Sequence, residues 1–325
     1  MDSIFDPKIL QQLFKAQFKI ETNVSELYFT SKYVYKIKKP VNLGFVDFTN
    51  SKNRNSMTLK EFKINKKISP KIYLKLIPIK IYKNKIILNG KGRIEEYAIK
   101  MIRLPQAGEL TNLLKKKRIN KNLIASLATI FAQLHAKFKP HSLDAKYGEY
   151  KIIKQNFDQV LRLIKSDAFP IFISKNDFEK FSSVTLSFLK SLQPVFKQRI
   201  QKHRIQMIHG DLHSENIFIY KQKPVITDAV LPIDNWIYGD VAIDVAALAM
   251  DLDAYGFKNF SDLFVSLYAQ KKHDATLEKV VPFYKISWAA IRFWVNSLAA
   301  KNNKREALPK VKLYKKILLE YLSKI

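Results

Sequence analysis

The sequence predicts an α+β protein with two lobes, a small N-terminal lobe rich in β-strands and a larger C-terminal lobe made mostly of helices. Two observations support this prediction. Short β-rich runs separated by polar turns dominate the chain before Gly108, whereas the pattern after it is mainly helical. We therefore assign residues 1–103 to the N-lobe and residues 104–325 to the C-lobe.

The N-lobe is expected to be a sheet with one helix. The helix is predicted at residues 51–68, where apolar residues such as Phe62 and Ile68 recur. Pro105 and Gly108 end the preceding strand, so residues 101–108 are the predicted hinge between the lobes. Strands are predicted at residues 26–29, 32–38, 75–82, 85–89 and 95–101.

The C-lobe is expected to be helical apart from one hairpin. Residues 217–220 are a short apolar strand, residues 221–224 a polar turn, and residues 225–227 a second strand. Helices are predicted at residues 111–114, 123–137, 156–164, 176–202, 240–254, 260–270, 277–301 and 309–325.

Side chains beside this hairpin are suited to a divalent metal ion. Asn216 precedes the first strand and Asp228 follows the second, so pairing of residue 217 with residue 227 places them opposite each other. Their Cβ atoms would then be about 4.5–5.5 Å apart. Both side chains offer the oxygen ligands that Mg²⁺ prefers. Asp211, in the loop before the hairpin, would face an acceptor hydroxyl group.

Two other interpretations of these residues were weighed. The Asp and Asn side chains could simply cap a polar loop and a turn. His209, Asp211 and His213 could also bind zinc, but no cysteine or further cluster of His and carboxylate side chains completes a shell of four ligands. We expect instead that His209 packs beneath the loop and holds its backbone by a hydrogen bond, and that His213 supports the loop as well.

The motif HGDLHSEN (residues 209–216) resembles the aminoglycoside phosphotransferase-like branch of the protein-kinase fold, in which His-Gly-Asp-x-His-x-x-Asn replaces the His-Arg-Asp and downstream Asn of protein kinases. The resemblance implies a bilobal protein-kinase-like fold, with ATP and Mg²⁺ as cofactors. It implies Asp211 as the catalytic base or the residue that orients the hydroxyl group, and Asn216 and Asp228 as metal ligands. Ala229 and Val230 stand where protein kinases have Phe-Gly, which argues against a protein-kinase switch rather than against catalysis.

Further motifs extend the resemblance from about residue 20 to about residue 300. They are similar to a bacterial subgroup of uncharacterised aminoglycoside phosphotransferase-like proteins. The wider family phosphorylates aminoglycosides, choline, homoserine, sugars and other hydroxyl compounds, so the resemblance implies a reaction type more than a substrate. The motifs are YKIKKPV (35–41), FVDF (45–48), SPKIYL (69–74), YAIKMIRLP (97–105) and DVAIDVA (240–246).

In the N-lobe, a nucleotide site needs a cation for the phosphates. Strand alternation puts Lys36 and Lys38 on one face, and we prefer Lys36, with Lys38 a close second. In kinases, a glutamate on the following helix positions the phosphate lysine, and Glu61 lies at a suitable place for this role. An exposed surface strand, with Glu61 as an ordinary helix-surface partner, is the alternative. The ATP adenine is expected against the backbone near Met101.

The N-lobe lacks the glycine-rich turn with which protein kinases cover the phosphates, since no glycine precedes Gly44. The equivalent turn is predicted near residues 21–25. Backbone N–H groups and the hydroxyls of Thr22 and Ser25 would contact the phosphates there. In the C-lobe, Asp240 and Asp244 lie at the start of a predicted helix, where carboxylates are favourable and can brace the catalytic loop.

The composition is strongly basic, with 57 Lys and Arg against 28 Asp and Glu and a net charge of +29. Lysines spread over the whole chain beside many Ile and Asn residues indicate compositional bias more than a nucleic-acid-binding patch, so nucleic acid or an anionic surface is possible but not favoured as a partner. The absence of cysteine suits a reducing compartment. The N-terminal residues 1–7 lack a signal pattern, no uncharged apolar run is long enough to span a membrane, and we expect a cytoplasmic protein.

The sequence therefore predicts an ATP- and Mg²⁺-dependent phosphotransferase that acts on a hydroxyl group of a small molecule. Rival hypotheses are nucleotidyl transfer or protein kinase activity on the same scaffold, and a basic pseudokinase that binds nucleic acid or anionic lipid. The sequence predicts neither the acceptor nor the oligomeric state.

Overall fold

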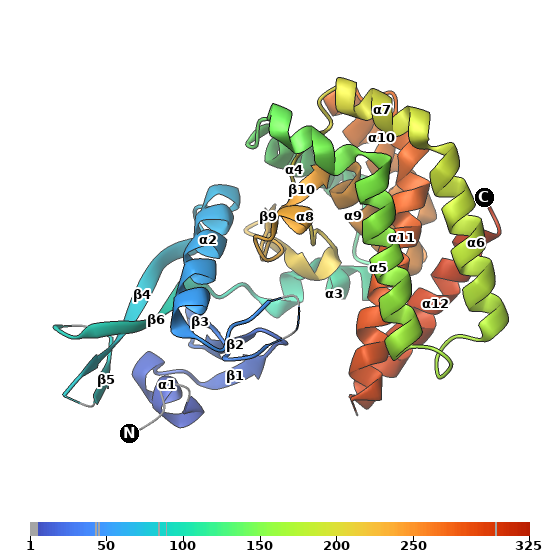
Figure 1. Cartoon of the computed structure of the whole chain (residues 1–325). Coiled ribbons are helices and arrows are strands. Elements are labelled where there is room, and N and C mark those ends of the chain that lie inside the picture. The colour runs from blue at the N-terminus through green and yellow to red at the C-terminus, as the bar shows by residue number, and fades with distance from the viewer. Residues whose placement is uncertain (1–5, 43, 45, 84, 89, 303) are drawn as a thin grey trace. The chain divides into compact units, whose positions relative to one another are not determined.

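The computed structural model describes residues 6–42, 44, 46–83, 85–88, 90–302 and 304–325. The chain divides into two compact units, both drawn in Figure 1. The first unit consists of Met1–Gly108 and Val225–Pro232, and the second of Glu109–Pro224 and Ile233–Ile325. The predicted boundary after residue 103 thus lies before the structural one, and the return of Val225–Pro232 to the first unit was not foreseen. Of the residues named above, 1–5, Phe45 and residue 89 lie outside the described part.

The first unit is built on a six-stranded antiparallel sheet. The sheet contains all the predicted strands, and one more, β1, which the sequence analysis missed. Helix α1 (Pro7–Phe14), which begins at the capping side chain of Asp6, was not predicted either. The strand order is β1 (Phe18–Glu21), β2 (Ser25–Phe29), β3 (Tyr33–Lys38), β6 (Arg93–Ile102), β4 (Tyr73–Tyr82) and β5 (Lys85–Ile87).

The two faces of this sheet carry different kinds of side chains. Strand alternation turns Ile37 of β3 into an apolar cluster with Leu10 and Phe14 of α1. The other face of β3 carries the side chains of Lys36 and Lys38, both of which are buried. One face of the sheet is therefore an apolar core, whereas the other holds buried charge.

Helix α2 (Ser51–Ile68) forms over the predicted residues and begins at the side chain of Asn50, which accepts a hydrogen bond from the Asn53 N–H group. Its buried face is mostly polar. The buried side chains recur at intervals of four and three residues, the spacing of one helix face, and are Arg54, Thr58, Glu61, Asn65 and Ile68. A helix that buries polar groups on its inner face is unusual in a structural core and indicates that this face serves a site.

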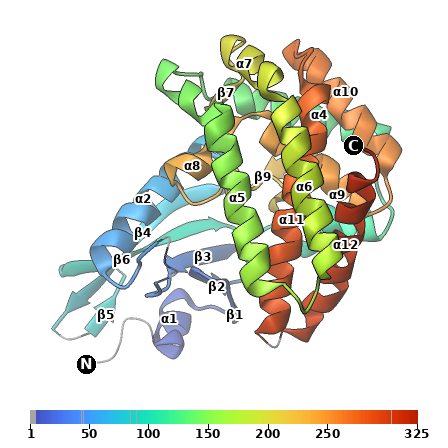
Figure 2. The same cartoon turned by 45° about the vertical axis from the view of Figure 1, so that its right-hand side comes forward.

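The second unit is mostly helical and confirms the predicted fold class. Helix α9 lies at its centre, with almost every residue buried. Helices α5, α6, α11 and α12 lie side by side in Figure 2. The helices are α3 (Leu110–Lys115), α4 (Lys121–Ala136), α5 (Tyr150–Asp167), α6 (Lys175–Ser191), α7 (Gln193–Gln201), α8 (Asp234–Ile237), α9 (Ala242–Ala254), α10 (Lys258–Lys272), α11 (Leu277–Lys301) and α12 (Leu308–Leu322).

Two features of this unit differ from the prediction. The single helix expected at residues 176–202 is two helices, since a new one starts at Gln193 with Pro194 in its first turn, a position where proline is well tolerated. A second short sheet also accompanies the predicted hairpin. Its strands are β7 (Ile205–Met207) and β10 (Tyr238–Asp240), while the hairpin strands are β8 (Ile217–Tyr220) and β9 (Lys223–Ile226).

In the part of the chain that the structure describes, we find no helix with the length and apolar character needed to cross a lipid bilayer.

Candidate active site

In the second unit, the loop between β7 and β8 presents the carboxylate of Asp211, whose side chain is 39% exposed. The Asn216 amide nitrogen donates to the Asp211 backbone oxygen at 2.8 Å and to its Oδ2 atom at 3.1 Å. His213 Nε2 lies 3.3 Å from Asp211 Oδ1. The loop is thus folded around an accessible carboxylate whose two oxygens both have partners.

The backbone of this loop is fixed from below by Asp244, near the start of α9. One carboxylate oxygen accepts from the His209 N–H group at 2.7 Å, and the other from the Gly210 N–H group at 2.9 Å. Asp244 is fully buried, and it also lies 3.0 Å from Nε2 of His135 in α4. The completely buried His209 accepts a hydrogen bond from the Asp211 N–H group at 3.3 Å through its Nδ1 atom. Two of the predicted supporting residues are therefore placed beneath the loop.

A third predicted support, Asp240, lies at the end of β10 in a separate ion cluster. It is buried and paired with both Nε and Nη2 of Arg199, at 2.5 and 2.6 Å. Its Oδ1 atom also accepts a hydrogen bond from the Ala242 N–H group at the start of α9. Its contacts are those of a residue that stabilises the fold.

Sequence reasoning missed a second anchor of the loop. Asp251 of α9 accepts hydrogen bonds from both the N–H and the hydroxyl of Ser214, at 2.8 and 2.6 Å. Its other oxygen accepts from the Tyr314 hydroxyl at 3.1 Å. Only the helical spacing from Asp244 to Asp251, two turns along one face, could have indicated that both carboxylates point toward the same loop.

Sequence reasoning also missed a charged network on the C-terminal helices. Arg292 of α11 donates to Glu215 Oε2 at 2.8 Å and has its Nη1 atom 3.5 Å from His213 Nε2. Lys310 of α12 pairs with the other Glu215 oxygen. This network fixes His213 beside Asp211.

The charges around Asp211 favour its ionised form. Burial alone would raise the pKa of this carboxyl group, but His213 and Arg292 outweigh that effect and lower it below its ordinary value. Glu215 behaves in the same way, because Arg292, His213 and Lys310 lower its pKa against the effect of burial. Asp211 is therefore a carboxylate, able to accept a hydrogen bond or a proton, at neutral pH.

Replacing Arg292 by glutamine is expected to raise the pKa of Asp211, because a nearby positive charge is lost while the burial remains. A pH titration of the Asp211 carboxyl carbon by NMR measures this directly, and the titration should move to higher pH. Arg292→Lys, which keeps the charge, should move it less. An unchanged titration in Arg292→Gln would show that the network does not act on Asp211.

In the first unit, Lys36 and Glu61 are brought together as predicted. Lys36 Nζ lies 2.9 Å from Glu61 Oε1, and it also pairs with Asp228. Burial would lower the pKa of Lys36, but Asp228 and Glu61 together raise it. Burial would raise the pKa of Glu61, but Lys36 and Lys38 lower it to about 2. Lys36 and Glu61 are therefore both charged at neutral pH.

Lys38 occupies a more enclosed position than Lys36. Its Nζ atom lies 2.5 Å from Glu61 Oε2 and 3.4 Å from the Ser25 hydroxyl, and burial lowers its pKa. Ser25 itself is completely buried. The Thr22 hydroxyl is engaged with the Ser25 backbone, accepting from its N–H at 2.9 Å. These contacts stabilise the turn between β1 and β2, and binding of the phosphates by Thr22 and Ser25 stays a prediction.

The segment bearing Asp228 is fastened to the first unit by three hydrogen bonds. The Asp228 N–H group donates to the Tyr73 hydroxyl at 2.8 Å, and the Ala229 N–H group donates to the Asn65 side-chain oxygen at 3.0 Å. The Ser69 hydroxyl donates to the Ile226 carbonyl at 2.5 Å. Asp228 has a φ angle of 59°, a left-handed conformation that costs energy for a residue with a side chain and that clusters at functional sites. Its side chain is 46% exposed.

The contacts described within each unit do not link Asn216 with Asp228, and they give Met101 only apolar neighbours. Asn216 belongs to the second unit and Asp228 to the first, so their shared metal site stays a prediction. Met101 lies near the end of β6, where it packs against the cluster of Ile72, Tyr73 and Ile99.

No family model matches the sequence of this protein. The chain is 23% identical over 287 residues to an uncharacterized protein of Mycobacterium tuberculosis and, equally, to one of Mycobacterium bovis. The match covers 88% of this chain but 56% of each relative, so the chain spans about half the length of the curated relatives it matches.

Solved structures give a similarity over nearly the whole chain. The GDP complex of an aminoglycoside 2'-phosphotransferase-IIIa matches 98% of this chain and 97% of its own, with a TM-score of 0.54 at 12% identity. An amicoumacin kinase in complex with AMP-PNP, Ca²⁺ and Ami matches 97% and 94%, with a TM-score of 0.55 at 14% identity. A choline/ethanolamine kinase family protein from Mesorhizobium loti matches 94% and 90%, with a TM-score of 0.50 at 12% identity.

These similarities confirm the predicted fold. The chain has the protein-kinase-like fold of aminoglycoside phosphotransferases and related small-molecule kinases. Because a fold can host several activities, the activity has to be argued from the side chains.

Proposed function

We propose that this protein is an ATP- and Mg²⁺-dependent phosphotransferase that moves the γ-phosphoryl group of ATP to a hydroxyl group of a small molecule. The observation that carries the proposal is the Asp211 loop. It presents an accessible and ionised carboxylate, held by Asn216 and His213, on a fold shared with kinases of small molecules.

In this proposal, Asp211 orients the acceptor hydroxyl and accepts its proton as the oxygen attacks the phosphorus atom. Phosphoryl transfer depends mainly on positioning and on charge stabilisation, so the fixed position of this carboxylate matters as much as its basicity. The backbone N–H groups of residues 209 and 210 donate to the Asp244 carboxylate, and these hydrogen bonds keep the loop in place.

Lys36 would bind the nucleotide phosphates, because it is the lysine that reaches both Glu61 and Asp228. Asn216 and Asp228 supply an amide and a carboxylate oxygen, a donor set that fits Mg²⁺. When bound, Mg²⁺ would offset the negative charge of the phosphate oxygens. Met101 stays the proposed neighbour of the adenine.

Binding of ATP with Mg²⁺ is expected to stabilise the wild-type protein but not Asp228→Asn, which keeps the shape of the side chain and removes its charge. At about 100 times the dissociation constant, a ligand adds ~2.7 kcal/mol to the free energy of unfolding. Thermal unfolding with ATP, with Mg²⁺ and with both measures the effect. An equal shift in the mutant would remove Asp228 from the site.

The transfer reaction itself is tested by incubating the protein with ATP, Mg²⁺ and pools of small hydroxyl compounds, followed by mass spectrometry of the products. Gain of one phosphoryl group by an acceptor supports the proposal. Gain of a nucleotidyl group would indicate nucleotidyl transfer instead. If ATP and Mg²⁺ leave the unfolding temperature unchanged and the protein binds nucleic acid in a salt-dependent way, the rival hypothesis of a basic pseudokinase would be favoured.

A further inference from the structure

A cavity lies in the second unit, where three helices have their C-terminal ends. It has a volume of about 150 Å³, whereas one water molecule needs only ~10–15 Å³ on the same scale. Helices α4, α7 and α10 all end near it, and β7 forms part of its wall. The cavity therefore has room for a small organic molecule as well as for an ion.

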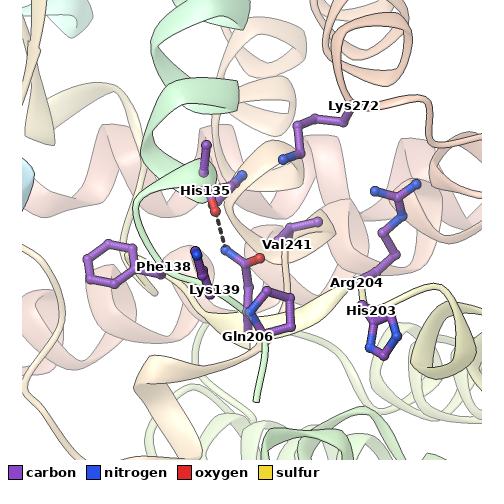
Figure 3. Close-up of a pocket in the computed structure, with 10 residues that line it drawn as sticks. His135, Phe138, Lys139, His203, Arg204, Gln206, Val241 and Lys272 are labelled. Carbon is purple, nitrogen blue, oxygen red and sulfur yellow. Dashed lines mark hydrogen bonds between the residues drawn. The ribbon is translucent and has the colours of Figure 1, made fainter. Parts of the chain in front are cut away.

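The lining of this cavity is basic. Among the described residues that line it, Lys139, Arg204 and Lys272 carry positive charge and none is Asp or Glu. Figure 3 shows these side chains arranged around the amide of Gln206, together with His203. Because the three cations come from three separate segments of the chain, the fold gathers them at one concave site.

Two of these cations have no hydrogen-bond or ion-pair partner among the residues that the structure describes. Arg204 donates to the His273 carbonyl at 2.7 Å and lies 3.7 Å from Asp274. Lys139 and Lys272, by contrast, make no hydrogen bond or ion pair with any residue that the structure describes. Lys272 is half-buried, and burial and the nearby Arg204 lower its pKa, with Asp274 opposing them. A bound anion would supply the partner that the ammonium groups of Lys139 and Lys272 lack among the described residues.

Helix ends explain part of this charge but leave the lysines available. Each helix C-terminus carries about half a negative charge, and α4, α7 and α10 end here at Ala136, Gln201 and Lys272. Cations at such ends are favourable. Yet the ammonium groups of Lys139 and Lys272 donate to none of the described carbonyl oxygens, so their hydrogen-bond donors remain for a ligand.

We propose that this cavity binds a small anion of the phosphate class, either inorganic phosphate or a phosphomonoester, through Lys139, Arg204 and Lys272. The site lies behind the catalytic loop and is connected to it. Gln206 in its wall donates to the His135 carbonyl at 2.7 Å, and the His135 ring contacts Asp244, which holds the loop backbone. The proposal does not depend on the activity of the protein, because binding alone tests it.

The test compares Lys272→Met with Lys271→Met by isothermal titration with inorganic phosphate, and separately with glycerol 3-phosphate, at an ionic strength held constant with sodium chloride. Lys271 is the exposed neighbour of Lys272 on the same helix, so both variants lose one charge. We expect Lys272→Met to weaken binding about tenfold or more and Lys271→Met to leave it nearly unchanged.

The two dissociation constants distinguish inorganic phosphate from a phosphomonoester, since the ligand that binds more tightly is the better occupant of the cavity. No binding of either by the wild type overturns the proposal. Equal weakening in both variants would show only the general positive field of the protein, and no weakening in either would place the anion elsewhere. Without ligand, Lys272→Met should melt no lower than Lys271→Met, because both variants lose a cation from the last turn of α10 and the Lys272 ammonium group has no further partner among the described residues. A melting temperature below that of Lys271→Met would contradict the lack of one.

Discussion

Replacing Asp211 by asparagine is expected to lower the rate of phosphoryl transfer by about 10²–10⁴-fold, the usual contribution of a positioned acid or base. Asparagine has nearly the same shape but cannot take up the proton of the acceptor hydroxyl. Stabilisation by ATP and Mg²⁺ should persist, because the proposed phosphate lysine and Asp228 lie in the other unit. The measurements are product formation with a substrate found by the screen and thermal unfolding with the nucleotide.

The matched control for this variant is Asp262→Asn, which makes the same chemical change at an exposed position of α10 in the same unit. It should keep full activity. Full activity in Asp211→Asn would instead exclude Asp211 as the catalytic base and, with it, the proposed mechanism.

Replacing Glu61 by glutamine is expected to lower the free energy of unfolding by about 3–5 kcal/mol, the cost of removing one partner from a buried ion pair. Glu61 lies between Lys36 and Lys38, at 2.9 and 2.5 Å, and all three side chains are buried. The variant leaves Lys38 without a carboxylate. Chemical denaturation measures the loss, and weaker stabilisation by ATP and Mg²⁺ should accompany it.

Glu21→Gln is the matched control for Glu61→Gln. Glu21 also pairs with two lysines, Lys19 at 2.6 Å and Lys39 at 3.4 Å, but its side chain is 48% exposed. Exposed pairs contribute about 0–1 kcal/mol. A similar small loss in Glu61→Gln would show that the buried lysines find other partners and that the pair does not organise the site.

The effect of Glu61 should depend on pH in a defined direction. Its pKa in the folded protein is about 2, below the ordinary value of 4.5, so its contribution is complete above the ordinary value and is lost as the pH falls toward 2. The difference in stability between the wild type and Glu61→Gln should therefore be constant near neutral pH and shrink below about pH 4.5.

Much of the fold could be predicted because its signals are local. The helices at Ser51–Ile68 and Leu277–Lys301 match the prediction at both ends. Short elements were not predicted, because β7 and β10 have three residues each, too few to show the alternation of a strand. At residues 176–202 the helical pattern continues through the break before Gln193, so composition alone did not separate α6 from α7.

The site was predictable where a motif carries it and unpredictable where it depends on distant residues. Asp211, Asn216 and Asp228 follow from the motif and the hairpin, and their roles remain proposals. The choice between Lys36 and Lys38 needed the contact with Asp228, which is far away in the sequence. Arg292 reaches the loop from a helix whose sequence carries no sign of it, and Asp251 is indicated only by its helical spacing from Asp244.

The interleaved division of the chain constrains how this protein can be recombined with others. A chimera that exchanges only residues 1–108 would replace Asn65, Ser69 and Tyr73 but keep the original segment Val225–Pro232. The hydrogen bonds between these three side chains and that segment would then be lost. A successful exchange of modules therefore has to transplant two separate pieces, the N-terminal one and this short internal one. A crossover placed at the hinge alone would divide one compact unit between two parents.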